Sequence, residues 1–353
     1  MKIIAIGDLH GDFYKFKRIL EETDTLKIIE SNPEDYQSLK IDFENLEDKI
    51  IVFIGDYVDW REEELENPLN LSKNQLIKGT AKILKSINII YNHPEYKNRF
   101  YFLVGNHEDM MFKALDFIFN YYLKNKDVQN KEKELNNLIN TISENPYKPI
   151  YESQDPFFSE KYFNFLNWYF QGGKNTISSF DNISIFIDNI TKLNFFKDLI
   201  LYLKVELENE LIFFSHTFPD DNEILTKVLN DFNNIENLDY VDEYLINQFL
   251  WSRKIWGIDA FNGKYTKPTE FEQIKDIFTN NKIKHYIVGH TKISKTNEPF
   301  YHFDGKIINI DLHGTPFSKP LILDNLNISD IDKNIKKLNY TNLFLQNFQF
   351  PYG

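Results

Sequence analysis

The pattern of apolar and polar positions divides the first third of the chain into short apolar runs and longer amphipathic stretches. Three runs rich in β-branched and aromatic residues, at 2–6, 49–54 and 99–104, predict buried strands. Between them, residues 13–22 and 72–91 carry apolar residues three and four positions apart, which is typical of helices, and Ser72 is a suitable N-cap. Alternating strands and helices predict parallel strands joined by crossover connections.

The rest of the chain predicts a long helical stretch followed by more closely spaced strands. Residues 109–170 are polar and helix-like, with many Lys, Asn and Glu residues at 124–144, and we interpret them as an inserted helical cap. Further apolar runs at 211–215, 285–288, 306–310 and 321–323 predict a second series of strands, with helices at 220–232 and 237–250. The later strands lie close together in the sequence, so we expect them to pair as antiparallel neighbours. This pattern predicts one domain at 1–325, with an insertion at about 109–170, and a tail at 326–353 that packs on the domain or extends from it.

Polar residues with metal-binding side chains follow the predicted strands. They are Asp8 and His10 after the first run, Asp56 after the second, Asn106 and His107 after the third, and His216 and His290 after later runs. Because ligands bind beyond the carboxyl ends of parallel strands, we expect these side chains to converge at one edge of the sheet. The flanking Gly7 and Gly11 allow the backbone to turn sharply there.

The side-chain types at this edge suit divalent metals. Carboxylate oxygens, amide oxygens and imidazole nitrogens bind such ions, and a pair of metals needs one shared ligand, for which Asp56 is the natural candidate. Asn106 can offer its amide oxygen, whereas the neighbouring His107 projects elsewhere and can give a proton to a leaving group.

The composition narrows the function classes. The 353 residues, 42% of them apolar and 16% aromatic, are enough for a sizeable core. A net charge of −13 argues against general binding to nucleic acids or anionic membranes, because these partners are themselves anionic. The absence of cysteine excludes disulfides, thiolate zinc sites and cysteine nucleophiles, and with them the cysteine-dependent phosphatases.

The hydropathy pattern contains no membrane span, because no apolar run approaches the roughly 18 residues that one needs. The first predicted strand begins at residue 2, which leaves no room for a cleaved signal peptide. We therefore expect a soluble, cytoplasmic protein, with export by a route without a cleaved leader left open.

Taken together, the motifs resemble those of the calcineurin-like metallophosphoesterase superfamily. The motifs GDLHG at 7–11, GDYVD at 55–59 and GNHE at 105–108, a strand-end His216, and VGHT at 288–291 occur in that superfamily's order. Within it, LWSR at 250–253 and NID at 309–311 are similar to the bacterial and phage serine/threonine phosphatases of the phosphoprotein phosphatase branch. The resemblance spans residue 3 to about residue 314. It implies a mixed α/β fold, a four-layer β-sandwich flanked by helices.

The resemblance also implies roles for individual residues. One metal would be held by Asp8, His10 and Asp56, and the other by Asp56, Asn106, His216 and His290; Mn²⁺ is the first choice, with Fe and Zn²⁺ left open. His107 would be the general acid and Asp59 the carboxylate that orients it. Arg253 would clamp the substrate phosphate, together with Asn106 and His107.

The implied function is a metal-dependent phosphatase that hydrolyses phosphomonoesters of phosphoproteins, with phosphoserine and phosphothreonine favoured and phosphotyrosine left open. One alternative is a nucleotide hydrolase resembling the diadenosine tetraphosphatases, in which Gln commonly replaces the histidine found here as His10. Another is a non-catalytic protein that binds a phosphorylated partner. Oligomeric state and partner proteins are not implied.

The sequence differs from the phosphoprotein phosphatase branch at two positions that bind phosphate in relatives. Trp60 and Val104 occupy positions where relatives carry phosphate-binding arginines. Arg61 could replace the first arginine, or Trp60 could form an aromatic wall for a flat substrate. Lys292 stands where many nuclease-like relatives have a second histidine, which favours the protein-phosphatase branch.

Overall fold

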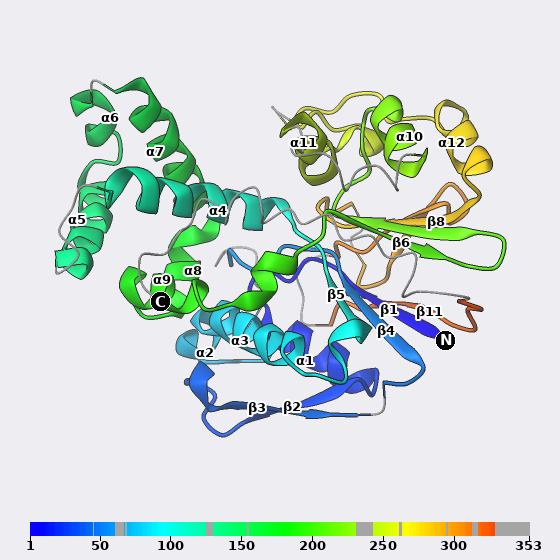
Figure 1. Ribbon diagram of the computed structural model, residues 1–353, viewed down its shortest axis with the longest axis horizontal. Helices are drawn as coiled ribbons and strands as arrows, with labels where there is room; N and C mark the ends of the chain where they lie inside the picture. The colour runs from blue at the N-terminus through cyan, green and yellow to red at the C-terminus, as the bar shows by residue number, and fades with distance from the viewer. Residues whose placement is uncertain are drawn as a thin grey trace.

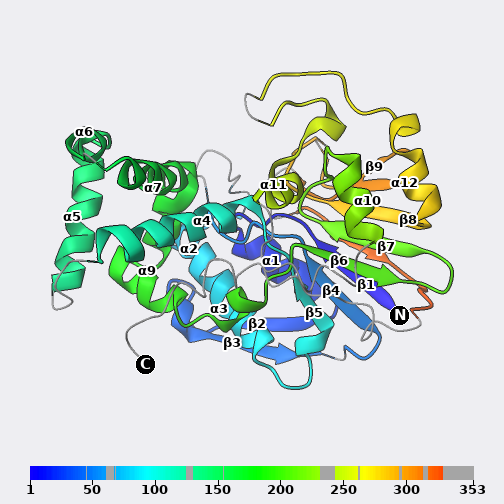
Figure 2. The ribbon, with the colours of Figure 1, turned by 45° about the horizontal axis from the view of Figure 1, so that its top comes forward.

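Two β-sheets stacked face to face form the centre of the molecule (Figures 1 and 2). The computed structural model describes residues 1–44, 46–60, 67, 69–124, 130–153, 155–230, 243–260, 263–293, 296–312 and 317–328. The first sheet has the strand order β11-β1-β4-β5 and the second has the order β6-β7-β8-β10-β9. The strands of the first sheet are β1 Lys2–Ile6, β4 Lys49–Phe53, β5 Phe100–Phe102 and β11 Leu321–Leu323. Those of the second are β6 Tyr202–Glu206, β7 Leu211–Ser215, β8 Ile283–Val288, β9 Phe300–His302 and β10 Ile307–Asn309.

The three strands predicted in the first third are confirmed, and they are parallel. Ile4 on β1 lies opposite Ile51 on β4, and Val52 on β4 lies opposite Tyr101 on β5. An additional antiparallel hairpin, β2 Leu26–Glu30 and β3 Leu39–Phe43, was not predicted. Its strands are half-exposed and rich in charged residues, so their hydrophobic signal is weak.

The antiparallel pairing predicted for the later strands is wrong. β10 runs parallel to β8, with Ile308 opposite Ile287. β10 lies between β8 and the edge strand β9. It is antiparallel to β9, and it therefore runs in the same direction as β8. β11 leaves this sheet and pairs with β1 in the first sheet, again antiparallel. Sequence proximity misled the prediction because the β9–β10 hairpin reverses the chain before β10.

The faces of the two sheets bury two different cores. The inner faces meet in an apolar layer that includes Ile3, Ala5, Ile50 and Val52 from the first sheet and Ile212, Phe214, Ile287 and Ile308 from the second. The intervening residues, such as Ile4 and Phe53, point outward and pack against helices. Helices therefore cover both outer faces (Figure 1), which gives the predicted four-layer arrangement.

The helices that flank the first sheet are α1 Phe13–Glu22, α2 Lys73–Ile77 and α3 Gly79–Tyr91. α1 matches its predicted bounds and is capped by Asp12. Ser72 is the predicted N-cap and forms a capping box with Gln75, but the helix predicted there is interrupted at Lys78. The helices on the second sheet are α10 Asn222–Asn230, α11 Glu243–Trp251 and α12 Lys275–Asn280.

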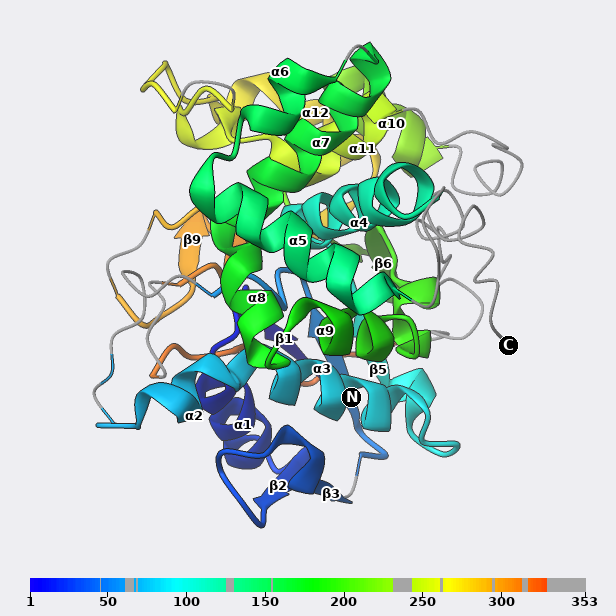
Figure 3. The ribbon, with the colours of Figure 1, turned by 90° about the vertical axis from the view of Figure 1, so that its left-hand side faces the viewer.

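A group of helices projects to one side of the sandwich (Figures 1 and 3). It contains α4 Asn106–Phe117, α5 Lys131–Glu144, α6 Lys148–Glu152, α7 Pro156–Trp168, α8 Lys174–Ser179 and α9 Ile183–Ile190. Helices thus occupy the described part of the predicted insertion and continue past residue 170. Most of the predicted tail lies outside the described residues. Among the described residues, no helix is both long and apolar enough to cross a membrane.

Candidate active site

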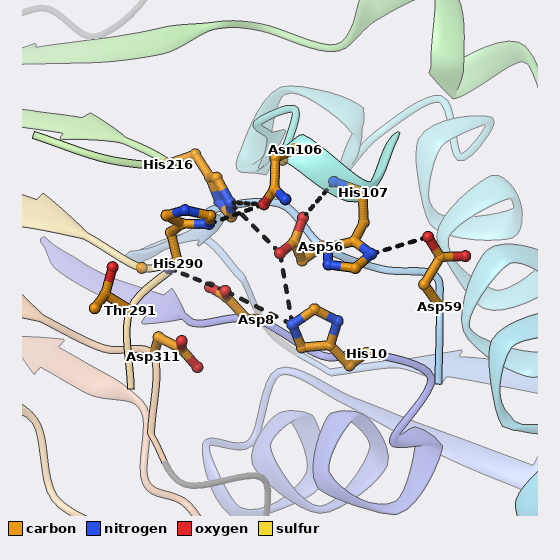
Figure 4. Close-up of polar contacts among 12 residues, drawn as sticks. Asp8, His10, Asp56, Asp59, Asn106, His107, His216, His290, Thr291 and Asp311 are labelled. Carbon is orange, nitrogen blue, oxygen red and sulfur yellow. Dashed lines mark hydrogen bonds and ion pairs between the residues drawn. The ribbon is translucent and has the colours of Figure 1, made fainter. Parts of the chain in front are cut away.

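The carboxyl ends of strands from both sheets meet at one place, and the residues singled out from the sequence gather there (Figure 4). Asp8 and His10 follow β1, Asp56 follows β4, and Asn106 begins α4 just after β5. His216 follows β7 and His290 follows β8. The structure therefore brings together all six residues that the sequence suggested as metal ligands, across more than 280 positions of the chain (His290 to Asp8).

The two glycines beside Asp8 serve different purposes. Gly11 has a φ of 71°, a left-handed conformation that favours glycine, as expected. Gly7 has no such φ; a Cβ on it would lie 1.9 Å from the backbone oxygen of Ile310, at the end of β10. A side chain on Gly7 would therefore clash with the backbone that follows β10.

Asp56 lies at the centre of the cluster. Its Oδ2 is 3.5 Å from Nε2 of His10 and 3.4 Å from Nε2 of His216. Its Oδ1 accepts a hydrogen bond from the backbone N–H of His107 (3.0 Å). Two groups that could hold a metal share this residue, His10–Asp56–His107 and Asp56–His216–His290, with ligand atoms within 4.8 Å of one another in each.

The second group is closed by Asn106. Its Oδ1 lies 2.9 Å from Nε2 of His216 and 2.9 Å from Nδ1 of His290. His216 donates from Nδ1 to the backbone oxygen of Ile54 (2.7 Å), which fixes the ring so that Nε2 faces the cluster. The backbone N–H of His290 donates to Oδ2 of Asp8 (2.9 Å), which links the two sheets at this point.

The electrostatics of these groups favour a bound cation. Burial, with the neighbouring Asp311, raises the pKa of Asp8 well above its usual range. Burial also acts to raise the pKa of Asp56, but His216 and His107 bring it well below its usual range. Burial opposes the charge of His216, yet Asp56 raises the pKa of that imidazole to about 10. Carboxylates buried this deeply require positive charge beside them, from protonated imidazoles or from a metal.

The donor set therefore fits divalent metal ions. It offers two carboxylates, three imidazoles and one amide oxygen, a mixture typical of Mn²⁺, Fe and Zn²⁺ sites. In addition, Oδ1 of Asp8 is buried without a hydrogen-bond partner among the residues that the structure describes. A buried carboxylate oxygen in that situation is accounted for by a metal ligand role.

Several site residues adopt a left-handed backbone conformation. The φ angles are 43° for His10, 54° for Asp56, 67° for Asp59 and 66° for His290. Such conformations cost on the order of 1–3 kcal/mol each in non-glycine residues and persist only where surrounding contacts impose them. Their concentration in three loops, those after β1, β4 and β8, indicates that the fold holds these side chains in set directions.

His107 forms a buried pair with Asp59 on the far side of the cluster (Figure 4). Its Nδ1 donates to Oδ2 of Asp59 (2.9 Å). The other carboxylate oxygen, Oδ1, accepts from Nε1 of Trp168 (3.0 Å) and from Oγ1 of Thr176 (2.8 Å). Asp59 is fully buried, and burial raises its pKa against the lowering effect of the His107 bond. Because the ring is held through Nδ1, a proton for a substrate has to come from Nε2.

A second buried carboxylate, that of Glu108, holds the loops that carry these residues. Burial, with the nearby Asp56, raises its pKa to about 7, while backbone N–H groups act in the opposite direction. These donors belong to the loop after β4 and to Gly105. The GNHE motif by itself indicates no such role for Glu108.

An open cavity of about 480 Å³ lies over the cluster. Arg253 reaches it from the segment after α11, and its Nε donates to Nε2 of His290 (2.9 Å). The lining includes His10, Asp56, Asn106, His107, Met110, Asn167, Gln171, Trp251, Arg253, Ala260, His290, Thr291, Lys292 and Asp311. The helical group thus contributes one wall of the cavity, through residues of α4, α7 and the turn after α7.

The proposed aromatic wall at Trp60 is wrong. Trp60 is only 3% exposed and does not line the cavity, and its backbone oxygen accepts from Asn175. Val104 is also fully buried. Arg61 lies outside the described residues. The indole contributes to packing because α8 covers the loop after β4.

Sequence reasoning missed several residues of the site. Asp311 belongs to the NID motif, which alone indicates no role for it, and Thr176 lies outside the motifs named above. Trp168 had no sequence signal at all, since it lies 109 positions from Asp59. His285 does not line the cavity, and its Nδ1 donates to the backbone oxygen of Gly305 (2.8 Å).

Comparisons with known proteins complete the description. The sequence model of the calcineurin-like phosphoesterase family matches residues 1–294. Among solved structures, the chain is similar to a cold-active protein tyrosine phosphatase, with 14% identity, coverage of 92% of this chain and 75% of that chain, and a TM-score of 0.41. It is also similar to a protein serine/threonine phosphatase from Saccharomyces cerevisiae, with 16% identity, 89% and 70% coverage, and a TM-score of 0.39. No curated protein sequence matches the chain.

Proposed function

We propose that this chain, which belongs to the calcineurin-like phosphoesterase family, hydrolyses phosphomonoesters of phosphoproteins with two divalent metal ions and His107 as general acid. Family membership makes the protein a metal-dependent hydrolase of phosphoesters; the substrate class, the metal pair and the residue roles are the proposal. The observation that carries it is the buried His107–Asp59 pair directly beside Asp56, the carboxylate shared by both candidate metal groups.

The metal assignment combines the family motifs with the geometry of the site, in which Asp56 belongs to both groups of possible ligands. Asp8, His10 and Asp56 would hold one ion, while Asp56 with Asn106, His216 and His290 would hold the other. Bound divalent ions would lower the pKa of a water molecule and neutralise phosphate charge. Mn²⁺ is our first choice, and the mixed oxygen and nitrogen ligands suit Fe and Zn²⁺ as well.

The chain's own groups supply the remaining parts of the reaction. His107 gives a proton from Nε2 to the leaving oxygen, while Asp59 holds the ring through Nδ1 and stabilises its charged form. Trp168 and Thr176 donate to the other oxygen of Asp59, which orients the carboxylate toward His107. Arg253 lines the same cavity and offers a planar guanidinium to the phosphate oxygens.

A phosphorylated side chain suits this cavity. Its lining is mostly polar, and α7 contributes the exposed Asn167 to it. Phe163 and Phe170 lie on the same exposed stretch of helix as Asn167 and are 56% and 62% exposed. This arrangement supports a substrate whose polypeptide stays at the rim. We favour phosphoserine and phosphothreonine, with phosphotyrosine as a further substrate. His10 supports a phosphoprotein over a dinucleotide substrate, because the resembling dinucleotide hydrolases commonly carry Gln at this position.

The test uses His107→Asn in the Mn²⁺-loaded protein. We expect kcat on a phosphoserine peptide, whose leaving group is poor, to fall about 10²- to 10⁴-fold. The loss should be smaller on p-nitrophenyl phosphate, whose leaving group needs little protonation, and calorimetry should show unchanged Mn²⁺ binding. His93→Asn, a histidine outside the cavity, is the matched control. Full activity of His107→Asn on the peptide would remove His107 from the mechanism, and faster hydrolysis of diadenosine tetraphosphate by wild type would overturn the substrate class.

A further inference from the structure

The phosphate grip of this protein has to differ from the one that its relatives' sequences imply. A phosphate dianion entering the cavity needs cationic side chains in addition to the groups that hold metal. Trp60 and Val104, which stand at the two arginine positions, are 3% and 0% exposed, so neither can reach the cavity. Among the residues that the structure describes, Arg253 and Lys292 are the cationic side chains that line it.

The backbone just before Lys292 is anchored by hydrogen bonds. His290 bends the chain with its left-handed φ of 66°, and the N–H of Thr291 then donates to the oxygen of Gly289 (2.8 Å). The backbone oxygen of Thr291 accepts from Nδ2 of Asn309 (3.0 Å), whose side chain is fully buried. Lys292 therefore starts from an anchored turn, although its own side chain is exposed.

The two cations approach the cluster from different segments. Arg253 is held against His290 by the bond from its Nε, while Lys292 follows His290 by two residues. Asp311 lies on the Asp8 side of the cluster, near Thr291 (Figure 4), is only 2% exposed, and lines the same cavity. The Lys292 charge is the strongest of the neighbouring charges that favour the ionised form of Asp311.

We propose that Lys292 is, after Arg253, the second phosphate-binding residue of this site. It takes over the role of the two arginines that relatives carry at the positions of Trp60 and Val104. This inference rests on the proposed function. A lysine is a compact point charge on a flexible stem, so it attracts a phosphate dianion without imposing the fixed two-point geometry of arginine. The grip on phosphate is therefore more adaptable and, because the side chain is exposed, more sensitive to salt.

The alternative is that Lys292 only balances the charge of Asp311. A charge-balancing lysine would affect stability or metal binding, whereas a phosphate-binding lysine affects the affinity for phosphate. The experiment therefore measures KM and kcat on a phosphoserine peptide, the inhibition constant of inorganic phosphate, and calorimetric binding of inorganic phosphate and of Mn²⁺.

The variants are Lys292→Gln, Lys292→Arg and the control Lys254→Gln, which removes an exposed lysine next to Arg253 that does not line the cavity. For Lys292→Gln we expect KM and the phosphate inhibition constant to rise about tenfold, with kcat changed by less than about threefold and Mn²⁺ affinity unchanged. Lys292→Arg should recover most of the affinity, and Lys254→Gln should match wild type.

Unchanged phosphate affinity in Lys292→Gln, or a loss confined to Mn²⁺ binding or thermal stability, would overturn the inference while the proposed function stands. If Mn²⁺-loaded wild type hydrolyses none of the phosphoesters, the proposed function fails instead. In that case phosphate calorimetry alone still decides the role of Lys292, because binding does not require turnover.

Discussion

Replacing Glu108 by glutamine tests whether one buried carboxylate holds the two main loops of the site together. Its Oε2 accepts from the backbone N–H groups of Asp56 (2.8 Å) and Gly105 (2.9 Å). Its Oε1 accepts from those of Tyr57 (2.8 Å) and Val58 (3.3 Å). The carboxylate therefore joins the loop after β4, which includes the left-handed Asp56, to the start of α4.

The magnitude follows from the geometry of the glutamine amide. Whichever way the amide is turned, its NH₂ group faces two backbone N–H donors, because each oxygen of Glu108 accepts two of them. Two buried donors then lose their acceptor, at a cost of about 1–3 kcal/mol each. We expect Glu108→Gln to lower the free energy of unfolding by about 2–6 kcal/mol, a large part of the 5–15 kcal/mol typical of folded proteins.

The assay is urea denaturation of the chelator-treated protein, followed by tryptophan fluorescence and far-UV circular dichroism. Glu132→Gln makes the same change on the exposed face of α5 and should stay within about 0.5 kcal/mol of wild type. Mn²⁺ affinity of Glu108→Gln should fall as well, since the backbone of Asp56 loses its support. A destabilisation no larger than that of Glu132→Gln would refute the reasoning and show that other groups satisfy these donors.

Three further predictions concern the proton donor, the metals and pH. Asp59→Asn should lower kcat by up to about 100-fold, at the lower end of the loss expected for a general acid. Adding Asp59→Asn to His107→Asn should cause no further loss of kcat, because the two residues act together. Additive losses in the double variant would contradict this pairing. Removing metal with a chelator should lower the melting temperature. Adding Mn²⁺ at 100 times its Kd should raise the free energy of unfolding by about 2.7 kcal/mol. Equal melting temperatures with and without metal would contradict the metal site. Burial lowers the pKa of His285, so the folded state binds fewer protons than the unfolded state. The stability present above about pH 6.5 is therefore lost as the pH falls from there through the folded-state pKa. His285→Gln should reduce this pH dependence of the free energy of unfolding, measured by denaturation at several pH values. An equal pH dependence in His285→Gln and wild type would rule out His285 as the cause.

Much of the central architecture is readable from short segments of the sequence. The runs at 2–6 and 211–215 coincide with β1 and β7, and α1 has its predicted bounds. Strand ends followed by Asp, His or Asn were enough to predict that Asp8, Asp56 and Asn106 converge, because parallel strands share one carboxyl edge. The hairpin of β2 and β3 was missed since its half-exposed strands carry little periodic signal.

Other features depended on which distant segments pack together. Asp59 is a loop residue in the sequence, and it becomes a buried partner of His107 because α7 brings Trp168 against it. The sequence leaves Trp60 available to a substrate, whereas in the structure α8 packs over its loop and buries it.

The sequence by itself determined the chemistry of the site, because the types of side chain at strand ends decide which metals and protons they can handle. The tertiary structure alone decided which of these groups are buried and which line the cavity, with Lys292 in the lining and Trp60 outside it. The physical reason is that periodicity and side-chain chemistry act over a few residues. Burial and charge pairing instead depend on contacts between segments far apart in the chain, such as β8 with β1 and α7 with the loop after β4.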